Sequence, residues 1–289
     1  MDTTKVAIVG AGPAGLTAAL YLGRAQIPTV LIDKDYGGGQ IISSPLLENV
    51  PGYYGPGADL AFNMLDEIKK YPSVELRDFT KVMQVIEVDG MYELILNDGS
   101  KLAAQYVICA TGADPIKLPG INTPNTHYCV TCDGALYQDK VVGVIGGGNS
   151  ALQYALELAN YASEVIVITN EAALRGEENM RKRVLTHDKI RCVFNFTAAY
   201  FDGKCLEDTD GETFIEMDGL FMAIGYKPQN GYLDVPKHNG YFVTGHYCKV
   251  YGNLYAAGDC RMKNHNQVVI AMRDGCVAAL DIIEKEQIA

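Results

Sequence analysis

The sequence is poor in basic residues and has no uninterrupted apolar run of membrane-spanning length. Its 289 residues include 24 Lys and Arg against 35 Asp and Glu, so the formal net charge is −11. Because nucleic acids and anionic membranes are bound by basic surfaces, this balance argues against both partners. An uncharged stretch at residues 6–23 is interrupted by Gly10, Gly12, Pro13 and Gly15, which fits a strand, a turn and a helix. We therefore expect a cytoplasmic protein without a membrane span or targeting segment.

The sequence also lacks the dense cysteine pattern of a secreted disulfide scaffold. Its 8 cysteines are scattered, as expected in a reducing compartment, and only Cys129 and Cys132 lie close together. Cys192 and Cys205 do not add a second C-x-x-C, so no metal site is expected. A C-x-x-C pair is typical of a disulfide that opens and closes easily, with a chance pair as the alternative. Asp133 fits either an acid–base group for the thiols or an ordinary turn residue.

Glycine, by contrast, is abundant, with 30 residues. Part of this glycine belongs to an internal repeat. A β-branched run enters the turn at residues 10–15 (GAGPAG), which is followed by a helical stretch and a second strand. The same order returns downstream, with its turn at residues 146–151 (GGGNSA). Each unit carries the G-x-G-x-x-G/A signature of a dinucleotide-binding βαβ motif, in which phosphates meet the N-terminus of the helix.

The residue that ends the second strand distinguishes the two units. An acid roughly 20 residues after the glycine turn binds the ribose hydroxyls, whereas nearby arginines bind the 2′-phosphate of NADP. Asp33 holds this position in the first unit, and Thr169 holds it in the second. Glu171 follows Thr169, and the next basic residue is Arg175. The second unit therefore does not favour NADPH, while an NAD site that uses Glu171 stays open.

Further segments complete the expected architecture. Residues 82–88 and 91–96 predict a hairpin, residues 105–112, 220–225 and 253–259 predict buried strands, and residues 268–283 predict a helix. The second glycine unit is then inserted into the first. We expect an α/β protein of two Rossmann-like domains, the first formed by residues 1–115 and 244–289 and the second by residues 116–243.

The order of the motifs identifies a family. In sequence they are residues 10–15, 38–40 (GGQ), 48–52 (ENVPG), 110–112 (ATG), 129–134 (CVTCDG), 146–151, 223–225 (AIG) and 256–259 (AAGD), followed by Gln267 and residues 275–276. Over nearly the whole chain this order resembles the low-molecular-weight thioredoxin reductases. The resemblance implies a three-layer ββα fold of FAD- and NAD-linked reductases, a homodimer, and an inserted domain that rotates about hinges near residues 116–117 and 240–245.

The resemblance implies that FAD binds in the first domain. Gly10, Gly12, Gly15 and Asp33 would hold its pyrophosphate and adenosine end. Gln40, Asn49, Asp259 and Gln267 would hold its ribityl and isoalloxazine end. The remaining cofactor-binding residues that we expect lie in the same motifs: Pro13, Ala14, Gly39, Ala110, Thr111, Gly112, Gly258 and Val268.

The resemblance also assigns the redox chemistry. It implies that Cys132 faces the flavin, that Cys129 attacks the disulfide of thioredoxin, and that Asp133 donates the proton. The chain departs from the NADPH-using members, which carry His-Arg-Arg where it has residues 169–171 (TNE). In this respect it is similar to clostridial-type flavin reductases that take electrons from ferredoxin.

Our leading expectation is therefore a ferredoxin-dependent thioredoxin reductase. An NADH-dependent reductase is the first alternative, with NADPH less favoured. An FAD dithiol oxidase that uses oxygen and a non-catalytic flavin redox sensor are the others. Because ferredoxins are usually acidic, a ferredoxin donor requires a local basic patch on this acidic chain. The candidates for that patch are Arg261, Lys263 and His265, together with residues 181–183.

Overall fold

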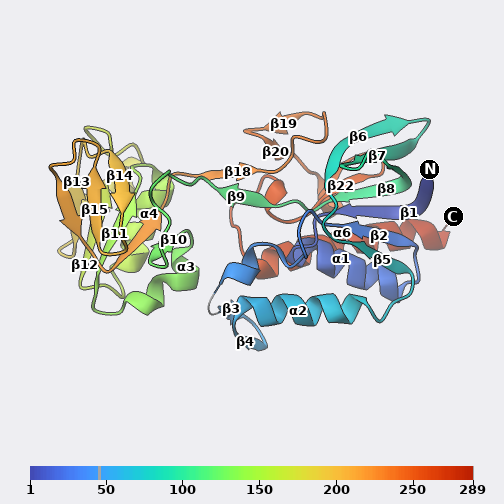
Figure 1. The fold of residues 1–289 in the computed structure, drawn as a ribbon, viewed down its shortest axis with the longest axis horizontal. Helices are drawn as coiled ribbons and strands as arrows, with labels where there is room; N and C mark the ends of the chain where they lie inside the picture. The colour runs from blue at the N-terminus through green and yellow to red at the C-terminus, as the bar shows by residue number, and fades with distance from the viewer. Residues whose placement is uncertain (45–46, 289) are drawn as a thin grey trace. The chain divides into compact units, whose positions relative to one another are not determined.

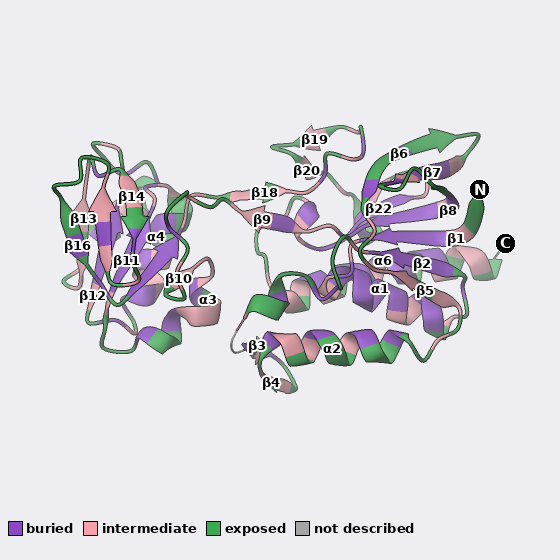
Figure 2. Cartoon of the chain, viewed as in Figure 1, coloured by how far each residue is buried: buried purple, intermediate pink, exposed green. Residues whose placement is uncertain are grey.

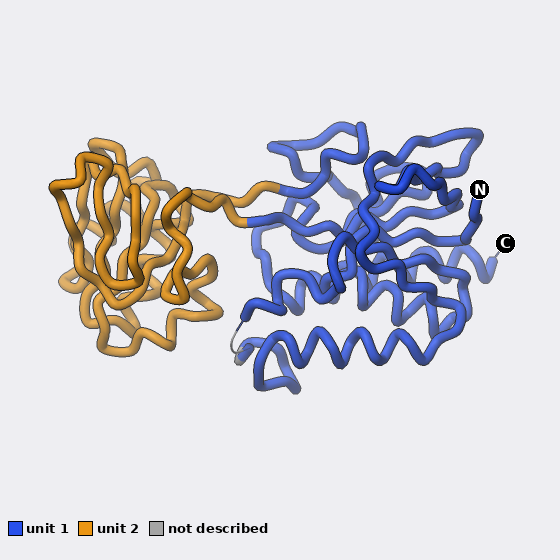
Figure 3. The backbone as a smooth tube through the Cα atoms, viewed as in Figure 1, with its two compact units in different colours: residues 1–114, 228–289 blue, residues 115–227 orange. Residues whose placement is uncertain are grey.

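A computed structural model describes residues 1–44 and 47–288 of the chain. The backbone divides into two compact units, residues 1–114 with 228–289 and residues 115–227 (Figure 3). The chain passes between them through β9 (Ala113–Pro115) and β18 (Tyr226–Pro228), which pair with each other. Among the described residues, no helix combines the length and the apolar character needed to cross a bilayer.

The first unit is built on a mainly parallel sheet in which helices cover one face (Figure 1). The strand order is β21-β22-β8-β1-β2-β5, and β7 adds to β8 with β6 beside it. The strands are β1 (Asp2–Val9), β2 (Thr29–Ile32), β5 (Val74–Arg77), β6 (Val82–Val88), β7 (Met91–Leu96), β8 (Lys101–Cys109), β21 (Lys249–Tyr251) and β22 (Leu254–Ala256). The helices are α1 (Pro13–Arg24), α2 (Gly57–Ile68) and α6 (Val268–Ile288). Shorter elements are β3 (Leu47–Val50), β4 (Tyr53–Gly55), β19 (Lys237–His238), β20 (Tyr241–Phe242), and the 3₁₀ turns Gly39–Ser43, His246–Cys248 and Gly258–Cys260.

The sheet of the first unit is apolar on both faces because a layer packs on each (Figure 2). Val6 and Ile8 of β1 face α1 and α6, whereas Ala7 and Val9 face the β6–β7 layer. A continuous apolar run is what a parallel strand between two layers requires. Helices α1 and α6 pack closely at Gly275, where the Cβ atom of any other residue would overlap the backbone of α1. The result is the three-layer ββα fold that the resemblance implies.

The second unit repeats the parallel sheet on a smaller scale. Its strand order is β10-β17-β11-β12-β13, and an antiparallel sheet β14-β15-β16 accompanies it. The strands are β10 (Thr126–His127), β11 (Val141–Ile145), β12 (Glu164–Ile168), β13 (Ile190–Val193), β14 (Ala198–Phe201), β15 (Cys205–Asp208), β16 (Phe214–Glu216) and β17 (Gly219–Met222). The helices are α3 (Val130–Asp133), α4 (Asn149–Leu158) and α5 (Glu178–Leu185), with a 3₁₀ turn at Gly134–Tyr137. The glycine turn at residues 146–148 joins β11 to α4, as the first glycine turn joins β1 to α1.

The second boundary between the units differs from the sequence prediction. It lies after residue 227, not at residues 243–244 where the prediction puts it. Residues 228–243 belong to the first unit because they are anchored there. Leu233 is buried in its core, and the Asn230 side chain donates hydrogen bonds to the carbonyl groups of Gly240 and Cys260 at 2.9 and 2.8 Å. A hinge at residues 240–245 would therefore lie inside a packed unit.

Candidate functional site

The two close cysteines form a disulfide in the second unit. Cys129 and Cys132 are bonded, with 5.3 Å between their Cα atoms, and both are half-buried. Cys129 precedes the first residue of α3, and its carbonyl accepts a hydrogen bond from the Asp133 amide at 3.1 Å. Val130, between the cysteines, is buried in the core of the unit. This packing holds the turn in place while both cysteines stay partly exposed.

The other cysteines are unpaired thiols, and several of them are chemically protected. Cys109, Cys248 and Cys260 are buried in the first unit. Burial raises the pKa of the Cys248 thiol to about 11 and that of the Cys260 thiol to about 12. Such thiols stay protonated near neutral pH and are poor nucleophiles. The described residues hold no cluster of His, Cys, Asp and Glu suited to a metal ion.

Asp133 has a partner that the sequence did not identify as functional. Its Oδ2 lies 3.2 Å from Nδ1 of His127, and Nε2 of His127 lies 2.6 Å from the hydroxyl of Tyr137. The Asp133 and His127 side chains are only 13 % and 11 % exposed. The position of His127 two residues before Cys129 permits a role beside the thiols, but from sequence alone a partly exposed loop histidine is the favoured interpretation.

The first glycine turn has the shape required for a bound pyrophosphate. Gly10 has φ +105°, and a side chain there would overlap the Ala110 carbonyl, so only glycine fits. No side chain caps the N-terminus of α1 at Gly12, where the first N–H groups of a helix lack partners within the helix. Asp33 holds the turn, since its Oδ2 accepts a hydrogen bond from the Ala11 amide at 2.5 Å. These features fit the pyrophosphate and ribose of a dinucleotide.

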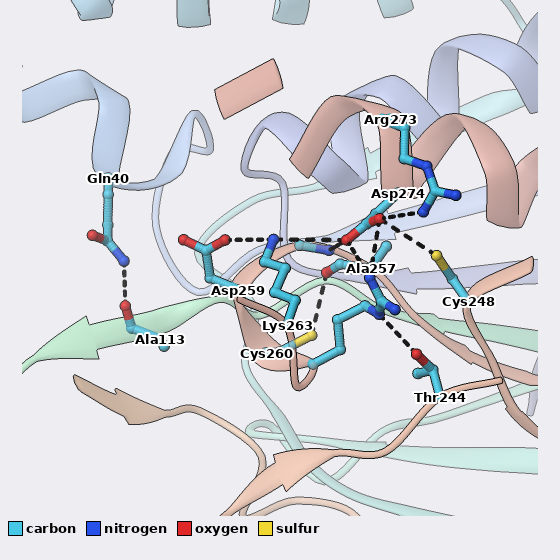
Figure 4. Close-up of polar contacts among 12 residues, drawn as sticks. Gln40, Ala113, Thr244, Cys248, Ala257, Asp259, Cys260, Lys263, Arg273 and Asp274 are labelled. Atoms are coloured by element: carbon cyan, nitrogen blue, oxygen red, sulfur yellow. Dashed lines mark hydrogen bonds and ion pairs between the residues drawn. The ribbon is translucent and has the colours of Figure 1, made fainter. Parts of the chain in front are cut away.

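The structure brings together the polar residues expected at the other end of the cofactor. Asn49 donates a hydrogen bond to Oε1 of Gln267 at 3.1 Å, although they are far apart in sequence. Gln40 donates to the carbonyl of Ala113 (Figure 4). Thr111, after β8, donates to Asn230 at 3.3 Å. The remaining expected residues lie beside these groups in the same loops: Gly39 at the start of the first 3₁₀ turn, Ala110 and Gly112 after β8, Pro13 and Ala14 in the first turn of α1, and Val268 at the start of α6.

A group of buried charges supports the turn that carries Gly258 and Asp259 (Figure 4). Asp274, fully buried on α6, contacts Arg261 and Arg273 at 3.0 Å each and accepts a hydrogen bond from the Gly258 amide at 3.3 Å. Burial alone would raise the pKa of Asp274, but the cations around it outweigh burial and lower that pKa. Lys263 contacts Asp259 at 2.8 Å and is 8 % exposed.

This geometry corrects the expectation that Arg261 and Lys263 form an exposed basic patch. Both side chains point inward and are ion-paired, and Arg261 is only 15 % exposed. A basic residue that neutralises a buried carboxylate offers little charge to a partner in solution. The other expected patch, residues 181–183, lies on α5, where Lys182 is exposed and pairs with Glu178 at 2.8 Å.

The second glycine turn is open but has no basic residue at residues 169–171. Gly148, before α4, has no atom near the position of a side chain, and no side chain caps the helix. Thr169, at the position of the expected acid, has no carboxylate to offer a ribose. Its side chain is buried against Gly147. Glu171 is half-buried and pairs with Arg175 at 3.1 Å. This surface can receive a pyrophosphate, and it places a carboxylate near the position of the ribose.

Comparison with known proteins assigns the family. Residues 4–275 match the sequence model described as pyridine nucleotide-disulphide oxidoreductase. Curated relatives from Listeria innocua and Bacillus subtilis, each named thioredoxin reductase, are 32% and 33% identical. The alignments cover 94% of this chain and 91% of the Listeria protein, and 96% and 93% for the Bacillus protein. The chain belongs to the low-molecular-weight thioredoxin reductases.

Solved structures agree with this assignment. The thioredoxin reductase from Streptococcus pyogenes superposes with a TM-score of 0.92 at 27% identity, covering 99% of both chains. The thioredoxin reductase from Giardia duodenalis gives a TM-score of 0.89 at 25% identity, covering 100% of both chains. The expected fold class is thereby confirmed, together with an FAD-dependent oxidoreductase that acts on a disulfide.

The comparisons are less specific about the electron donor and the assembly of this thioredoxin reductase. They do not show ferredoxin as the donor, and they do not show a homodimer. The sequence led us to doubt that NADPH is used. The comparisons do not support this doubt, because the matching family model is described as a pyridine nucleotide-disulphide oxidoreductase. The alternative of a nucleotide-dependent thioredoxin reductase is therefore better supported than our leading expectation.

Proposed function

We propose that this thioredoxin reductase reduces thioredoxin through Cys129 and Cys132 and takes its electrons from a pyridine nucleotide. The observation that carries the redox assignment is the half-exposed disulfide with the Asp133 carboxyl group directly after it. The open glycine turn before α4 supports a nucleotide donor, because it leaves the N-terminus of a helix available to phosphate groups.

The steps of thioredoxin reduction follow the path of one electron pair through the Cys129–Cys132 disulfide. Bound FAD would supply an electron pair taken from the nucleotide, and this pair opens the Cys129–Cys132 bond. By resemblance to the family, the Cys129 thiolate then attacks one sulfur of the thioredoxin disulfide and forms a mixed disulfide. Asp133 donates a proton to the sulfur that leaves. Cys132 attacks Cys129, restores the internal disulfide and releases thioredoxin in its dithiol form.

In the first unit, the residues expected to hold FAD fit the group. The turn at residues 10–15 would bind the pyrophosphate at the N-terminus of α1. The Asp33 carboxylate would still be able to accept a hydrogen bond from a ribose hydroxyl. Asn49 and Gln267 already form one hydrogen-bonded pair, with Asp259 on a turn fixed by Asp274. These polar groups would orient the ribityl chain and the ring system.

The identity of the nucleotide depends on Glu171. A carboxylate accepts hydrogen bonds from the ribose hydroxyls of NADH, whereas it repels the extra phosphate of NADPH. Arg175 is the next basic residue along the chain, but it is paired with Glu171 at 3.1 Å. We therefore expect NADH to be used in preference to NADPH.

Ferredoxin is the second candidate donor. The observation that favours it is the stretch of residues 169–171, which contains no arginine where NADPH-using members of the family have a basic pair. Since Arg261 and Lys263 are buried ion pairs, the ferredoxin surface would have to include residues 181–183 on α5. Charge reversal at Lys182 and Arg183 would then slow ferredoxin-driven turnover, and salt would weaken it.

An anaerobic titration of the FAD-loaded enzyme tests the donor. NADH, NADPH and reduced ferredoxin are added separately, and flavin absorbance is followed before thioredoxin is supplied. We expect NADH to bleach the flavin rapidly and to support thioredoxin reduction. Rapid bleaching by ferredoxin alone would overturn the nucleotide proposal and support the second candidate.

A charge exchange tests the role of Glu171 directly. The double variant Asn170→Arg with Glu171→Arg should lower the KM for NADPH by about tenfold or more, the size expected for new hydrogen bonds to a charged phosphate. Glu212→Arg is the control, because it makes the charge change of Glu171→Arg at an exposed turn of the same unit. Equal NADPH kinetics in the double variant and the control would contradict the assignment.

We further propose that the enzyme is a homodimer. An apolar groove of about 430 Å³ on the first unit is lined by side chains of α1, α2 and α6, among them Leu20, Met64 and Met272. Grooves of this kind are common at contacts between subunits. Sedimentation equilibrium should give twice the chain mass, and Met272→Glu should reduce it to the mass of one chain. A monomeric wild-type enzyme would refute the proposal.

A further inference from the structure

His127 occupies a defined position beside the redox disulfide. It is the last residue of β10, which pairs in parallel with β17 so that His127 lies opposite Phe221. The imidazole stacks on the Phe221 ring at 5.1 Å between centroids, with an angle of 29° between the planes. It also meets the edge of Tyr137 at 5.2 Å. A ring packed in this way has one orientation, and both of its nitrogen atoms are directed to fixed partners.

The hydroxyl of Tyr137 and the carboxyl group of Asp133 face the two ring nitrogens of His127. Burial raises the pKa of Tyr137 to about 12, and the carboxylates of Asp133 and Asp218 add to this effect. The hydroxyl therefore stays protonated and can donate its hydrogen to Nε2 at 2.6 Å. When Nε2 accepts this hydrogen, Nδ1 is left to donate its proton to Asp133 Oδ2, which lies 3.2 Å away.

We propose that His127 is a positioning residue for the redox site, orienting the Asp133 carboxyl group to donate a proton to the sulfur that leaves when Cys129 attacks the thioredoxin disulfide. This inference rests on the proposed role of Asp133. With Oδ2 held by His127, Oδ1 is left to exchange a proton with the sulfur. When Cys129 attacks thioredoxin, the S–S bond of thioredoxin breaks, its electron pair stays on the leaving sulfur, and the Asp133 proton neutralises that sulfur.

Few groups packed around His127, other than Asp133, could take part in this proton transfer. Asp133, at the end of α3, and Tyr137, in the turn after it, face the ring. From β17 the ring meets only the apolar side chain of Phe221. Beyond Tyr137, Lys140 lies 5.4 Å from the tyrosine ring centre, and the Asp218 carboxylate acts on its hydroxyl. Asp133 is thus the acidic group in direct contact with His127 among the described residues.

Two isosteric variants separate the hydrogen bond from the packing. The amide nitrogen of asparagine can replace Nδ1 of histidine, so His127→Asn keeps a donor toward Asp133. The amide of glutamine replaces Nε2, so His127→Gln keeps a contact with Tyr137 and loses that donor. Single-turnover oxidation of the reduced FAD enzyme by thioredoxin is measured for both variants between pH 5 and pH 9.

We expect His127→Gln to slow this step by about tenfold, the effect of losing one hydrogen bond to a charged group. His127→Asn should keep the rate within about threefold and the pH–rate profile of the wild type. Wild-type behaviour of both variants, or an equal loss in both, would overturn the inference.

The Asp133→Asn variant keeps this result separate from the proposed function. If Asp133→Asn reduces thioredoxin at the wild-type rate, the role proposed for Asp133 fails, and the role of His127 fails with it. If Asp133→Asn is slow while His127→Gln is as fast as the wild type, only the inference on His127 fails. Thermal unfolding of each variant and its flavin spectrum verify that the fold and the cofactor are retained.

Discussion

Replacing Asp274 by asparagine should destabilise the first unit. Asparagine has the shape of aspartate but no charge, so the change removes the carboxylate and leaves the packing in place. Asp274 is fully buried and contacts Arg261 at 3.0 Å. Loss of one partner of a buried ion pair costs about 3–5 kcal/mol, because the other charge remains buried without compensation.

The neighbouring cations place the effect at the lower end of this range. Lys263 keeps Asp259 as a partner at 2.8 Å, and the Arg273 side chain is 62 % exposed and stays hydrated. Arg261, at 15 % exposed, is the cation left without its partner. We therefore expect a loss of about 3 kcal/mol in the free energy of unfolding. A loss of this size lowers Tm by roughly 6–12 °C.

The assay is thermal unfolding of the FAD-loaded enzyme at pH 7, followed by the release of flavin fluorescence and by circular dichroism. The matched control is Asp188→Asn, whose side chain is 92 % exposed and which should stay within about 0.5 kcal/mol of the wild type. An Asp274→Asn enzyme with the Tm of the control would refute the reasoning.

The pH dependence gives the same prediction a second readout. The pKa of Asp274 is lowered in the folded protein, so its carboxylate stabilises the fold above the pKa of an unfolded aspartate, about 3.9. That stabilisation disappears as the pH falls through the lowered pKa. The difference in stability between the wild type and Asp274→Asn should thus be full at pH 7 and shrink below about pH 4. A difference that stays constant between pH 7 and pH 3 would show that charge is not its cause.

Other substitutions test the site at single positions. Cys129→Ser should abolish thioredoxin reduction while the donor still bleaches the flavin, and retained turnover would contradict the redox assignment. Gly10→Ala should prevent FAD binding, since its methyl group would overlap the Ala110 carbonyl, and equilibrium dialysis with FAD would reveal any wild-type affinity. Tyr255→Phe should destabilise the protein by about 1–3 kcal/mol in urea unfolding, because the hydroxyl donates to buried Asp281 at 2.6 Å.

Much of the fold follows from local sequence signals. The hairpin expected at residues 82–88 and 91–96 is confirmed as β6 and β7. Asp89 and Gly90 have φ of +50° and +79°, the left-handed values that a tight hairpin turn requires. The glycine turns are equally local, because their signature lies between a strand and a helix in both units. In these places the chain conformation depends on a few adjacent residues.

Contacts between distant residues account for what the sequence could not predict. The second domain boundary depends on Asn230 and Leu233, whose partners lie elsewhere in the first unit. Likewise, lysine is a residue type that usually lies at the surface, but the carboxylates of Asp259 and buried Asp274 hold Lys263 inward. His127 becomes recognisable only when β10, α3 and the following turn bring it to Asp133 and Tyr137. No spacing in the sequence records such a meeting.

The two glycine turns illustrate how one backbone pattern can serve different partners. Both open at the N-terminus of a helix without a side-chain cap, so both can bind phosphate groups. In the first unit, Asp33 ends the strand and holds the turn through the Ala11 amide. In the second unit, buried Thr169 takes this position, and the acidic residue Glu171 lies two residues further along the chain. The common turn thus offers a similar place for phosphate groups in both units, and the residues after the strand are what distinguish the two.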